Sequence, residues 1–359
     1  MRQPPDSLCK VSRESYFHQR LKENLAAVAG RRRDKVDVLR AALWYQVVKE
    51  GLGASTAYTI ERQIEQNRAF GKNQDGVRFH RNKWSKYEIG THVPEKKLVA
   101  KAEIKVPGSA RILNHPLWEA LRIRQPKKLT PNARFQQLGS RTCKVVYKTL
   151  PFGSGGGASR RALHRTLPML ERRAGIDALA ALTILLKEAN ARSDTGAAME
   201  IGRSLYNVLL MLCGATTSFG SIAEELIELY SERIFRRIVH DGHYFNVRGF
   251  EFSEATKFLR LVLKDFLPAG KIDPIWGNKV RAMFALLDGK YGWDLLFALS
   301  PPVSHASNSN PDNSLFCKRC TMNRGLRHWG RENYLVGGSR KFPEPEILRR
   351  IQAGAWAAP

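Results

Sequence analysis

Residues 177–191 read DALAALTILLKEANA and include the longest candidate for a membrane span, the nearly all-apolar run 178–186. A membrane-spanning helix needs about 20 apolar residues in a row, and this run is under half that length before Lys187 and Glu188 follow. The segment therefore predicts a helix buried inside a globular protein, and no membrane partner.

Amphipathic helical patterns continue on both sides of this segment, from about residue 159 to residue 300. Their lengths and apolar stripes are typical of a multi-helix bundle or an orthogonal helical array, and no fixed repeat indicates a solenoid. The region predicts an all-helical domain for packing, homo-oligomer contacts or binding of a protein partner. The segments are RALHRTLPMLERRA, GAAMEIGRSLYNVLLMLCGA, SIAEELIELYSERIFRRIV, SEATKFLRLVLKDFL and KVRAMFALLDG.

Charge is the most informative part of the composition. The 359 residues include 59 Lys and Arg against 33 Asp and Glu, which leaves a net charge of +26. Residues 1–150 hold 31 basic and 13 acidic residues, residues 151–300 hold 19 and 16, and residues 301–359 hold 9 and 4. Such an excess predicts a polyanionic partner, bound mainly by the N-terminal part. The 43% apolar content excludes a disordered chain.

The ends and the cysteines indicate a cytoplasmic protein. The N-terminal MRQPPDSLCKVSRESYF has no apolar run after its charges, so no signal peptide is expected. Five cysteines form no disulfide framework, which suits a reducing compartment.

Two N-terminal helices are expected before residue 66. Val36, Leu39, Leu43 and Val47 are spaced like one face of a helix that Asp34 caps. After the turn GLGAS, a second helix carries Ala57, Ile60 and Ile64. The spacing suits a helix-turn-helix unit or a plain helical hairpin. Residues 67–77 are expected to be a loop, with helix from about Phe79 to Gly90 and Pro94 in the first turn of the next helix.

Residues 85–94, SKYEIGTHVP, follow the pattern S-x-aromatic-E-x-G-x-x-x-P. This resembles the third helix and following turn of Cro/phage-repressor-type helix-turn-helix domains, over residues 55–102 at most. We expect Phe79, Trp84 and Tyr87 to be buried and Gly90 to take the left-handed conformation. The chain departs from the family pattern in two ways: Glu61 stands where a small Ala is usual, and residues 67–77 replace a tight turn.

The resemblance and the charge together predict DNA binding through the outward face of this third helix. Arg and Lys donate to guanine or phosphate, and Asn pairs with adenine. The predicted function is a sequence-specific or semi-specific DNA-binding protein, such as a bacterial or mobile-element transcriptional regulator. The alternative is a nucleic-acid-directed effector or enzyme of a phage-defence or transposition system. The predicted DNA-binding residues are Arg78, His80, Arg81, Asn82, Lys83 and Lys86.

The predicted fold class is mainly α, with a basic helix-turn-helix-like domain followed by a multi-helix bundle. The stretch GSGGGAS at 153–159 imitates a dinucleotide fingerprint, but its surroundings lack strand-helix alternation and favour a linker. The segment KVVYKTLPF is expected to be a short strand, and the tail after residue 314 to have little periodicity. The expected divisions are 1–33 (basic segment), 34–125 (DNA-binding), 126–158 (connector and linker), 159–300 (helical) and 301–359 (linker and basic tail).

No cofactor is predicted, although two clusters resemble metal sites. Cys317, Cys320 and His328, with His305, could hold zinc, but a second ligand pair is missing. His240, Asp241 and His243 are more typical of a helix end and turn. The basic aromatic stretch RHWGRENY suits either stacking on a single nucleic-acid strand or a tail that folds back on the helical domain.

Overall fold

Helices make up most of the structure, as the sequence predicts. The computed structural model describes residues 6–28, 33–65, 70–72, 78–80, 82–122, 131–149, 160–266, 276–306 and 315–354. Within these ranges the strands form two antiparallel pairs, β1 with β2 and β3 with β4. The mainly α fold class is therefore confirmed.

The elements follow one another with short connections. The N-terminal elements are α1 (Asp6–Ala27), α2 (Lys35–Gly51), α3 (Ala57–Glu65), β1 (Phe70–Lys72), β2 (Arg78–His80), α4 (Lys83–Glu88), α5 (Lys96–Lys105), α6 (Ser109–Leu113) and α7 (Pro116–Arg122). The middle of the chain forms α8 (Pro131–Phe135), α9 (Ser140–Thr149), α10 (Arg160–Glu171), α11 (Ile176–Ala191), α12 (Thr195–Ala215), α13 (Thr217–Gly220) and α14 (Ala223–Arg233). The last elements are the 3₁₀ helix η3 (Phe235–Arg237), β3 (His243–Phe245), α15 (Gly249–Phe266), α16 (Trp276–Leu287), α17 (Trp293–Ala298), β4 (Val303–His305), α18 (Leu315–Leu335) and α19 (Pro345–Gln352).

The large core is built around α11 and α12. Every residue from Ala178 to Lys187 is buried, so the prediction of a buried helix at 177–191 is confirmed. Helices α7, α9 and α10 pack against α11, and α15 and α16 pack against α12. No helix in the described ranges is long and apolar enough to cross a membrane.

Lys187 and Arg233 attach α7 to this core. The Lys187 Nζ donates a hydrogen bond to the Ala120 carbonyl, and Arg233 Nη1 donates to the Leu121 carbonyl at 3.1 Å. Carbonyls in the last turn of a helix lack intrahelical partners and lie at the negative end of its dipole. Burial, and then the charges of nearby arginines, lower the pKa of Lys187 to about 8.

A second, smaller core lies at the N-terminal end, and α2 contributes to both cores. The first half of α2 buries Val36, Leu39 and Leu43 in the large core. Its second half enters the small core, whose buried residues are Trp44, Tyr45, Val48, Ala54, Ile60, Ile64, Trp84, Tyr87, Leu98, Val99, Ala102 and Leu113. The predicted cap of α2 is present, since the Asp34 Oδ1 accepts from the Val36 N–H at 2.8 Å.

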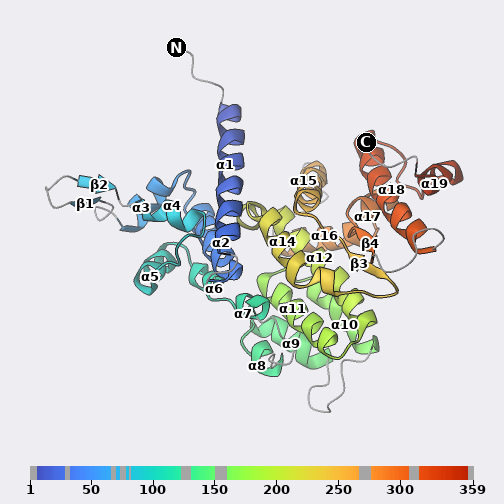
Figure 1. Ribbon diagram of the computed structural model, residues 1–359, viewed down its shortest axis with the longest axis horizontal. Coiled ribbons are helices and arrows are strands. Elements are labelled where there is room, and N and C mark those ends of the chain that lie inside the picture. Colours follow the sequence, from blue (N-terminus) through green and yellow to red (C-terminus); the bar gives the residue numbers. More distant parts are fainter. Residues whose placement is uncertain are drawn as a thin grey trace.

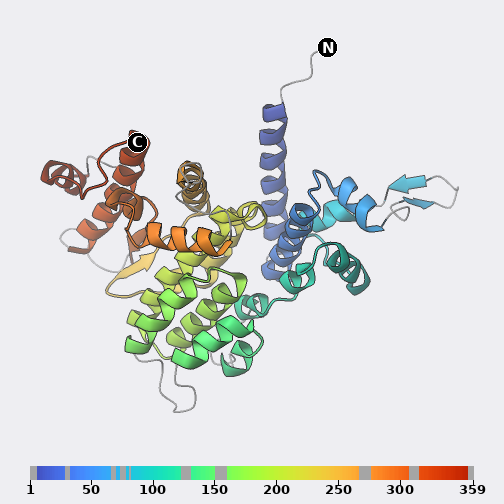
Figure 2. The same cartoon turned by 180° about the vertical axis from the view of Figure 1, so that it is seen from behind.

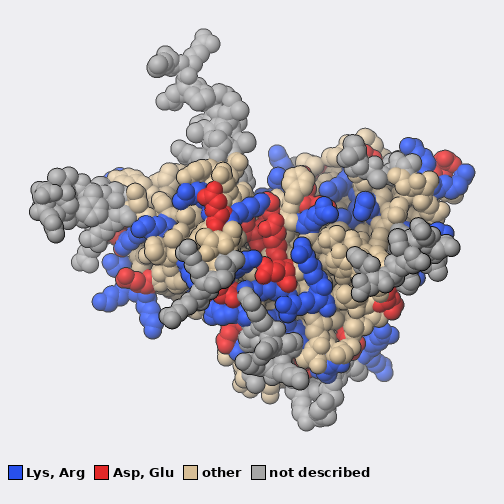
Figure 3. Space-filling model, viewed as in Figure 1, with Lys and Arg blue, Asp and Glu red and all other residues tan. Residues whose placement is uncertain are grey.

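Charged contacts fix α1 and α2 against α14. His18 Nδ1 lies 2.8 Å from Glu225 Oε1, and Lys35 Nζ lies 2.6 Å from Glu232 Oε2. Lys22 Nζ of α1 also forms an ion pair with Glu224 of α14. Figure 3 shows a group of acidic side chains at the centre of this face, with basic side chains around it. In Figures 1 and 2, α1 extends from the body, the β1–β2 hairpin lies at one end, and α17–α19 lie at the other.

The expected helix from Phe79 is wrong at its start. Residues 78–80 form β2, which pairs with β1 in the register Phe70↔His80, so the segment between α3 and α4 contains a β-hairpin. Helix α4 begins only at Lys83, after Asn82 in the left-handed region with φ 49°. Pro94 also lies outside a first turn, because α5 begins at Lys96 with Glu95 as its N-cap.

Two further segments are helices where other structure was expected. The segment KVVYKTLPF at 144–152, expected to be a strand, is helical over its described part. Residues 140–149 form α9, because Thr142, Val145 and Val146 repeat at helical spacing and are buried. The tail forms α18, where Gly325 lies against Ile351 and Gly330 against the backbone of α17, closer than a Cβ atom would allow. Residues 303–305 of the expected linker form β4. The glycine-rich stretch 153–159 lies outside the described residues.

Gly90 ends α4 under a double constraint. Its φ is +66°, as predicted for the left-handed stop, and a Cβ built on it would lie 2.3 Å from the Val38 carbonyl oxygen. Gly53 has a similar φ of +60° with nothing within 4 Å of a built Cβ. A comparison of alanine variants at the two glycines therefore separates the cost of backbone strain from the cost of the close approach of α4 to α2.

We predict that Gly90→Ala destabilises the protein far more than Gly53→Ala does. The left-handed conformation alone costs a non-glycine residue about 1 kcal/mol or more, and Gly90→Ala adds the clash with α2. Urea unfolding followed by circular dichroism measures both free energies. Equal losses for the two variants would contradict this packing of α4 on α2.

Asp177, in the first turn of α11, joins three segments of the chain. It accepts hydrogen bonds from Gly139 N at 3.0 Å and from Arg111 Nη2 at 2.7 Å. His115 Nε2 lies 3.0 Å from its Oδ1, while His115 Nδ1 accepts from the Leu117 N–H, so Nε2 carries the proton. Burial alone would raise the pKa of Asp177, but these hydrogen bonds and the positive charge of Arg111 lower it to about 2.

We predict that Asp177→Asn removes a pH-dependent part of the stability. A carboxylate with a depressed folded pKa stabilises the protein above its unfolded pKa of about 4, and this contribution is lost as the pH falls toward 2. The variant should lose about 2 kcal/mol at neutral pH and less near pH 3. Urea unfolding at both pH values measures this, with Asp288→Asn, whose side chain is 52% exposed, as the control. An unchanged pH dependence in Asp177→Asn would contradict the assignment.

Candidate nucleic-acid interface

Two aromatic side chains anchor the short helix α4 in the small core. Trp84 is fully buried and stacks on Trp44 of α2, with ring centroids 5.5 Å apart and an interplanar angle of 17°. Tyr87 is 6% exposed and meets Trp84 edge to face at 5.7 Å. The predictions that Trp84 and Tyr87 are buried are therefore confirmed. Aromatic pairs of this kind contribute about 0.5–1.5 kcal/mol beyond the area they bury.

Glu65, the last residue of α3, fixes α4 from the side. Its Oε1 lies 2.6 Å from Lys83 Nζ, and its Oε2 accepts from Trp84 Nε1 at 3.1 Å. The same carboxylate faces Tyr87, and burial followed by the charges of nearby glutamates raises the pKa of Tyr87 to about 12. Glu65 thus joins α3 to α4 across the β-hairpin that separates them in the sequence.

The C-terminal end of α4 is held by side chains that precede it in the chain. Asn24 Nδ2 of α1 donates to the Ile89 carbonyl at 2.6 Å, and Arg33 Nη2 donates to the Gly90 carbonyl at 2.6 Å. On the α2 side, Glu88 Oε1 lies 3.9 Å from Lys49 Nζ. These contacts satisfy carbonyls that the end of a helix leaves without partners.

The structure divides the predicted DNA-binding residues into three groups. Asn82 and Lys86 are exposed on the outward face of α4, together with Ser85. Lys83 is only half-exposed and forms the ion pair with Glu65, so it contributes less to that face than predicted. Arg81 lies outside the described residues, as do the side chains of Arg78 and His80, whose backbone forms β2.

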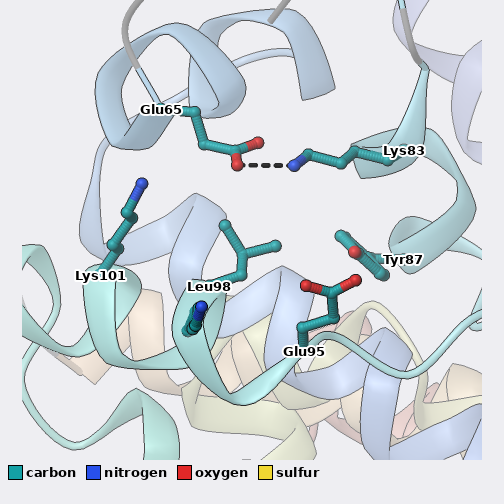
Figure 4. A pocket seen from close by; sticks show the side chains of 7 residues that line it. Glu65, Lys83, Tyr87, Glu95, Leu98 and Lys101 are labelled. Atoms are coloured by element: carbon teal, nitrogen blue, oxygen red, sulfur yellow. Dashed lines mark hydrogen bonds and ion pairs between the residues drawn. The ribbon is translucent and has the colours of Figure 1, made fainter. Parts of the chain in front are cut away.

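A hollow of about 250 Å³ lies between α4 and α5, and three lysines line it. Lys83 comes from α4, and Lys97 and Lys101 come from α5; Glu65 and Glu95 complete the charged lining. Figure 4 shows Lys101 and the Glu65–Lys83 pair on opposite sides of Leu98, which lies in the floor of the hollow. Three lysines from two helices thus line this hollow together with two glutamates.

A larger groove, of about 950 Å³, lies on the other side of α4. Asn82 and Ser85 line it from α4, facing Arg20 and Tyr16 of α1. Tyr58, at the start of α3, is 48% exposed and also lines it. The outward face of α4 therefore lies between a lysine-lined hollow and an open groove whose lining includes aromatic side chains, two cations and two glutamates.

The sequence prediction missed the lysines of α5. Lys96, Lys97, Lys101 and Lys105 are all exposed, and no ion pair of theirs is found among the described residues. Leu98, Val99 and Ala102 of the same helix are buried. The four-residue spacing of Lys97, Lys101 and Lys105 beside these apolar residues was the signal that could have found them.

The part of the chain that the structure describes shows no metal site among the weaker candidates. Among the described residues, no group of three or more His, Cys, Asp and Glu side chains could hold a metal ion. Cys320 lies on α18 as a free thiol, His328 Nδ1 lies 3.3 Å from Glu332 Oε2, and the Cys317 side chain lies outside the described residues. His243 and His305 face each other across β3 and β4 with ring centroids 6.1 Å apart.

The aromatic tail folds back on the helical body. Trp329 is 4% exposed, and Tyr334 donates its hydroxyl hydrogen to Asp265 Oδ2 at 3.0 Å. Of the two readings of RHWGRENY, the folded-back tail is therefore the one confirmed. Trp329 is not available to stack on a nucleic-acid base.

Searches against protein-family models, curated proteins and solved structures find no match to this chain.

Proposed function

We propose that this protein binds duplex DNA through α4 and α5, with Asn82, Ser85 and Lys86 toward the bases and Lys97 and Lys101 toward phosphates. The large helical core would serve as the scaffold and as the surface for oligomer or partner contacts. A regulatory role at specific or semi-specific DNA sites is the form of this activity that the helix-turn-helix resemblance favours.

The observation that carries the proposal is the convergence of basic side chains around one rigid, outward-facing helix. Lys83, Lys97 and Lys101 line one hollow beside α4, and Lys86 is exposed next to it. Stacking of Trp84 on Trp44 fixes the position of α4, so an exposed side chain on it can keep a constant register against a base edge. Phosphate contacts position a protein on DNA, and base contacts give specificity.

The helix pair α3 and α4 also supports the proposal, with one difference from the family pattern. Ile60 and Ile64 are buried as in a helix-turn-helix unit, and Glu61 is buried between them. A β-hairpin replaces the tight turn before α4, and Glu65 restores the link between the helices. Two short helices thereby keep a fixed relation even though 17 residues separate Glu65 from Lys83 in the chain.

We predict that the double variant Lys97→Ala and Lys101→Ala weakens binding of all duplexes by about tenfold at about 0.1 M salt. Each lost phosphate contact should reduce the slope of log affinity against log salt by about one. Fluorescence anisotropy with a labelled duplex measures both quantities in the full chain. The control is Lys257→Ala with Lys290→Ala, which removes the same charge from exposed sites on α15 and beyond α16. Equal effects of the two double variants would reject α5 as the contact.

We predict that Asn82→Gly relaxes sequence preference while leaving binding to random duplexes nearly unchanged. Glycine tolerates the φ of 49° at this position, so the side chain is removed without backbone strain. Loss of an Asn–adenine contact costs about 1–3 kcal/mol of discrimination. Sites selected by the wild type from a random duplex library, competed against random duplex, provide the measurement. If the wild type selects no preferred site, the protein is a non-specific binder and base reading by α4 is rejected.

A further inference from the structure

The stretch from residue 120 to residue 170 has an unusual charge composition. It contains 11 Lys and Arg residues and no Asp or Glu, in a chain that has 33 acidic residues in total. Between Glu119 and Glu171, which flank the stretch, these cations therefore have no acidic neighbour in sequence. Any neutralising partner must come from elsewhere in the fold or from another molecule.

The fold neutralises some of these cations but leaves a group of them unpaired. Arg122 lies 2.6 Å from Asp37, Arg134 pairs with Glu119, and Arg160 lies 4.0 Å from Glu200. Five other cations of the stretch lie on α9 and α10 and are exposed, with no ion pair among the residues that the structure describes. They are Arg141, Lys144, Lys148, Arg161 and Arg165.

Helices α9 and α10 present these five side chains outward because their opposite faces are buried. On α9 the buried residues are Val145 and Val146, and on α10 they include Leu163 and Leu167. The two helices contact each other, and both pack on α11. Figures 1 and 2 place them at the end of the molecule opposite to α1. We call the outward side of this pair the α9–α10 face.

The types of side chain on the α9–α10 face indicate which kind of polyanion it can bind. No large hydrophobic side chain described on either helix is exposed, so the face lacks the apolar anchors used by membrane-surface helices and by protein interfaces. Tyr147 is half-buried, and its hydroxyl donates a hydrogen bond to the Asn132 carbonyl oxygen at 3.1 Å. What is left is a set of cations that suits a backbone of regularly spaced phosphates.

The spacing of the cations also suits a duplex. Arg141, Lys144 and Lys148 follow one side of α9 over a length of about 10 Å. Duplex DNA carries one negative charge for about every 1.7 Å of its axis, so several phosphates lie within reach of this row. Arginine adds paired hydrogen bonds to phosphate oxygens, and lysine adds a point charge.

We propose that the α9–α10 face is a second DNA-contacting surface, which holds the phosphate backbone of a duplex without reading its sequence. It is separate from the α4–α5 surface in the chain and in the fold. It therefore extends the proposed function and does not depend on base reading by α4.

The test uses the full chain and a random-sequence duplex of about 25 base pairs. The variant Arg141→Ala, Lys144→Ala and Lys148→Ala changes only exposed positions of α9 to the best helix-forming residue, so the helix should persist. We expect affinity at about 0.1 M salt to fall at least about tenfold and the salt slope to shrink by about two to three. The control Lys257→Ala, Lys264→Ala and Lys290→Ala removes the same charge and should change affinity less than about twofold.

A second measurement, on the unaltered protein, tests whether duplex covers the α9–α10 face itself. Duplex should slow acetylation of Lys144 and Lys148, read by mass spectrometry, and should leave Lys257 and Lys290 unchanged. The proposal would be overturned if the two triple variants lost affinity equally, or if duplex did not protect Lys144 and Lys148. Tighter binding of single strands or of anionic vesicles than of duplex would also overturn it. Failure of Lys97→Ala with Lys101→Ala to weaken binding rejects the α5 contact alone and leaves this surface standing.

Discussion

The burial of one helix in two cores is the constraint on which the candidate interface depends. Val36, Leu39 and Leu43 of α2 lie in the large core, and Trp44 lies in the small one. A helix that is buried along its whole length cannot rotate without exposing apolar surface, at a cost of about 1.5–3 kcal/mol for each large side chain. Because Trp84 stacks on Trp44, the position of α4 follows from the position of α2.

Charge compensation is the second principle of this fold. Acidic residues of α14 neutralise basic residues of α1 and α2, as in the Lys35–Glu232 pair, and Asp177 neutralises Arg111. On α5 and on the α9–α10 face, exposed cations have no such pairs among the residues that the structure describes. The excess positive charge behind the net charge of +26 therefore belongs to particular surfaces and not to the protein as a whole.

Local patterns in the sequence predicted much of the helical framework. Near-continuous apolarity predicted α11, the cap Asp34 and its spacing predicted α2, and the positions of Trp84, Tyr87 and Gly90 predicted which side of α4 is buried and where it ends. The failures also have physical reasons. Residues 78–80 pair as a strand with a partner segment, and α9 is helical because Val145 and Val146 are covered by other helices. Neither contact is visible in a local pattern.

The site shows the same division between sequence and structure. By itself the sequence determined which residues could carry the chemistry, namely an excess of lysine and arginine, a left-handed glycine and an aromatic pair at helical spacing. Only the tertiary structure decided that Glu65 neutralises Lys83, that Lys97 and Lys101 reach the same hollow, and that Trp329 is buried. The reason is that ion pairing and burial depend on distances between segments far apart in the chain, and these distances are set by how the helices pack on one another.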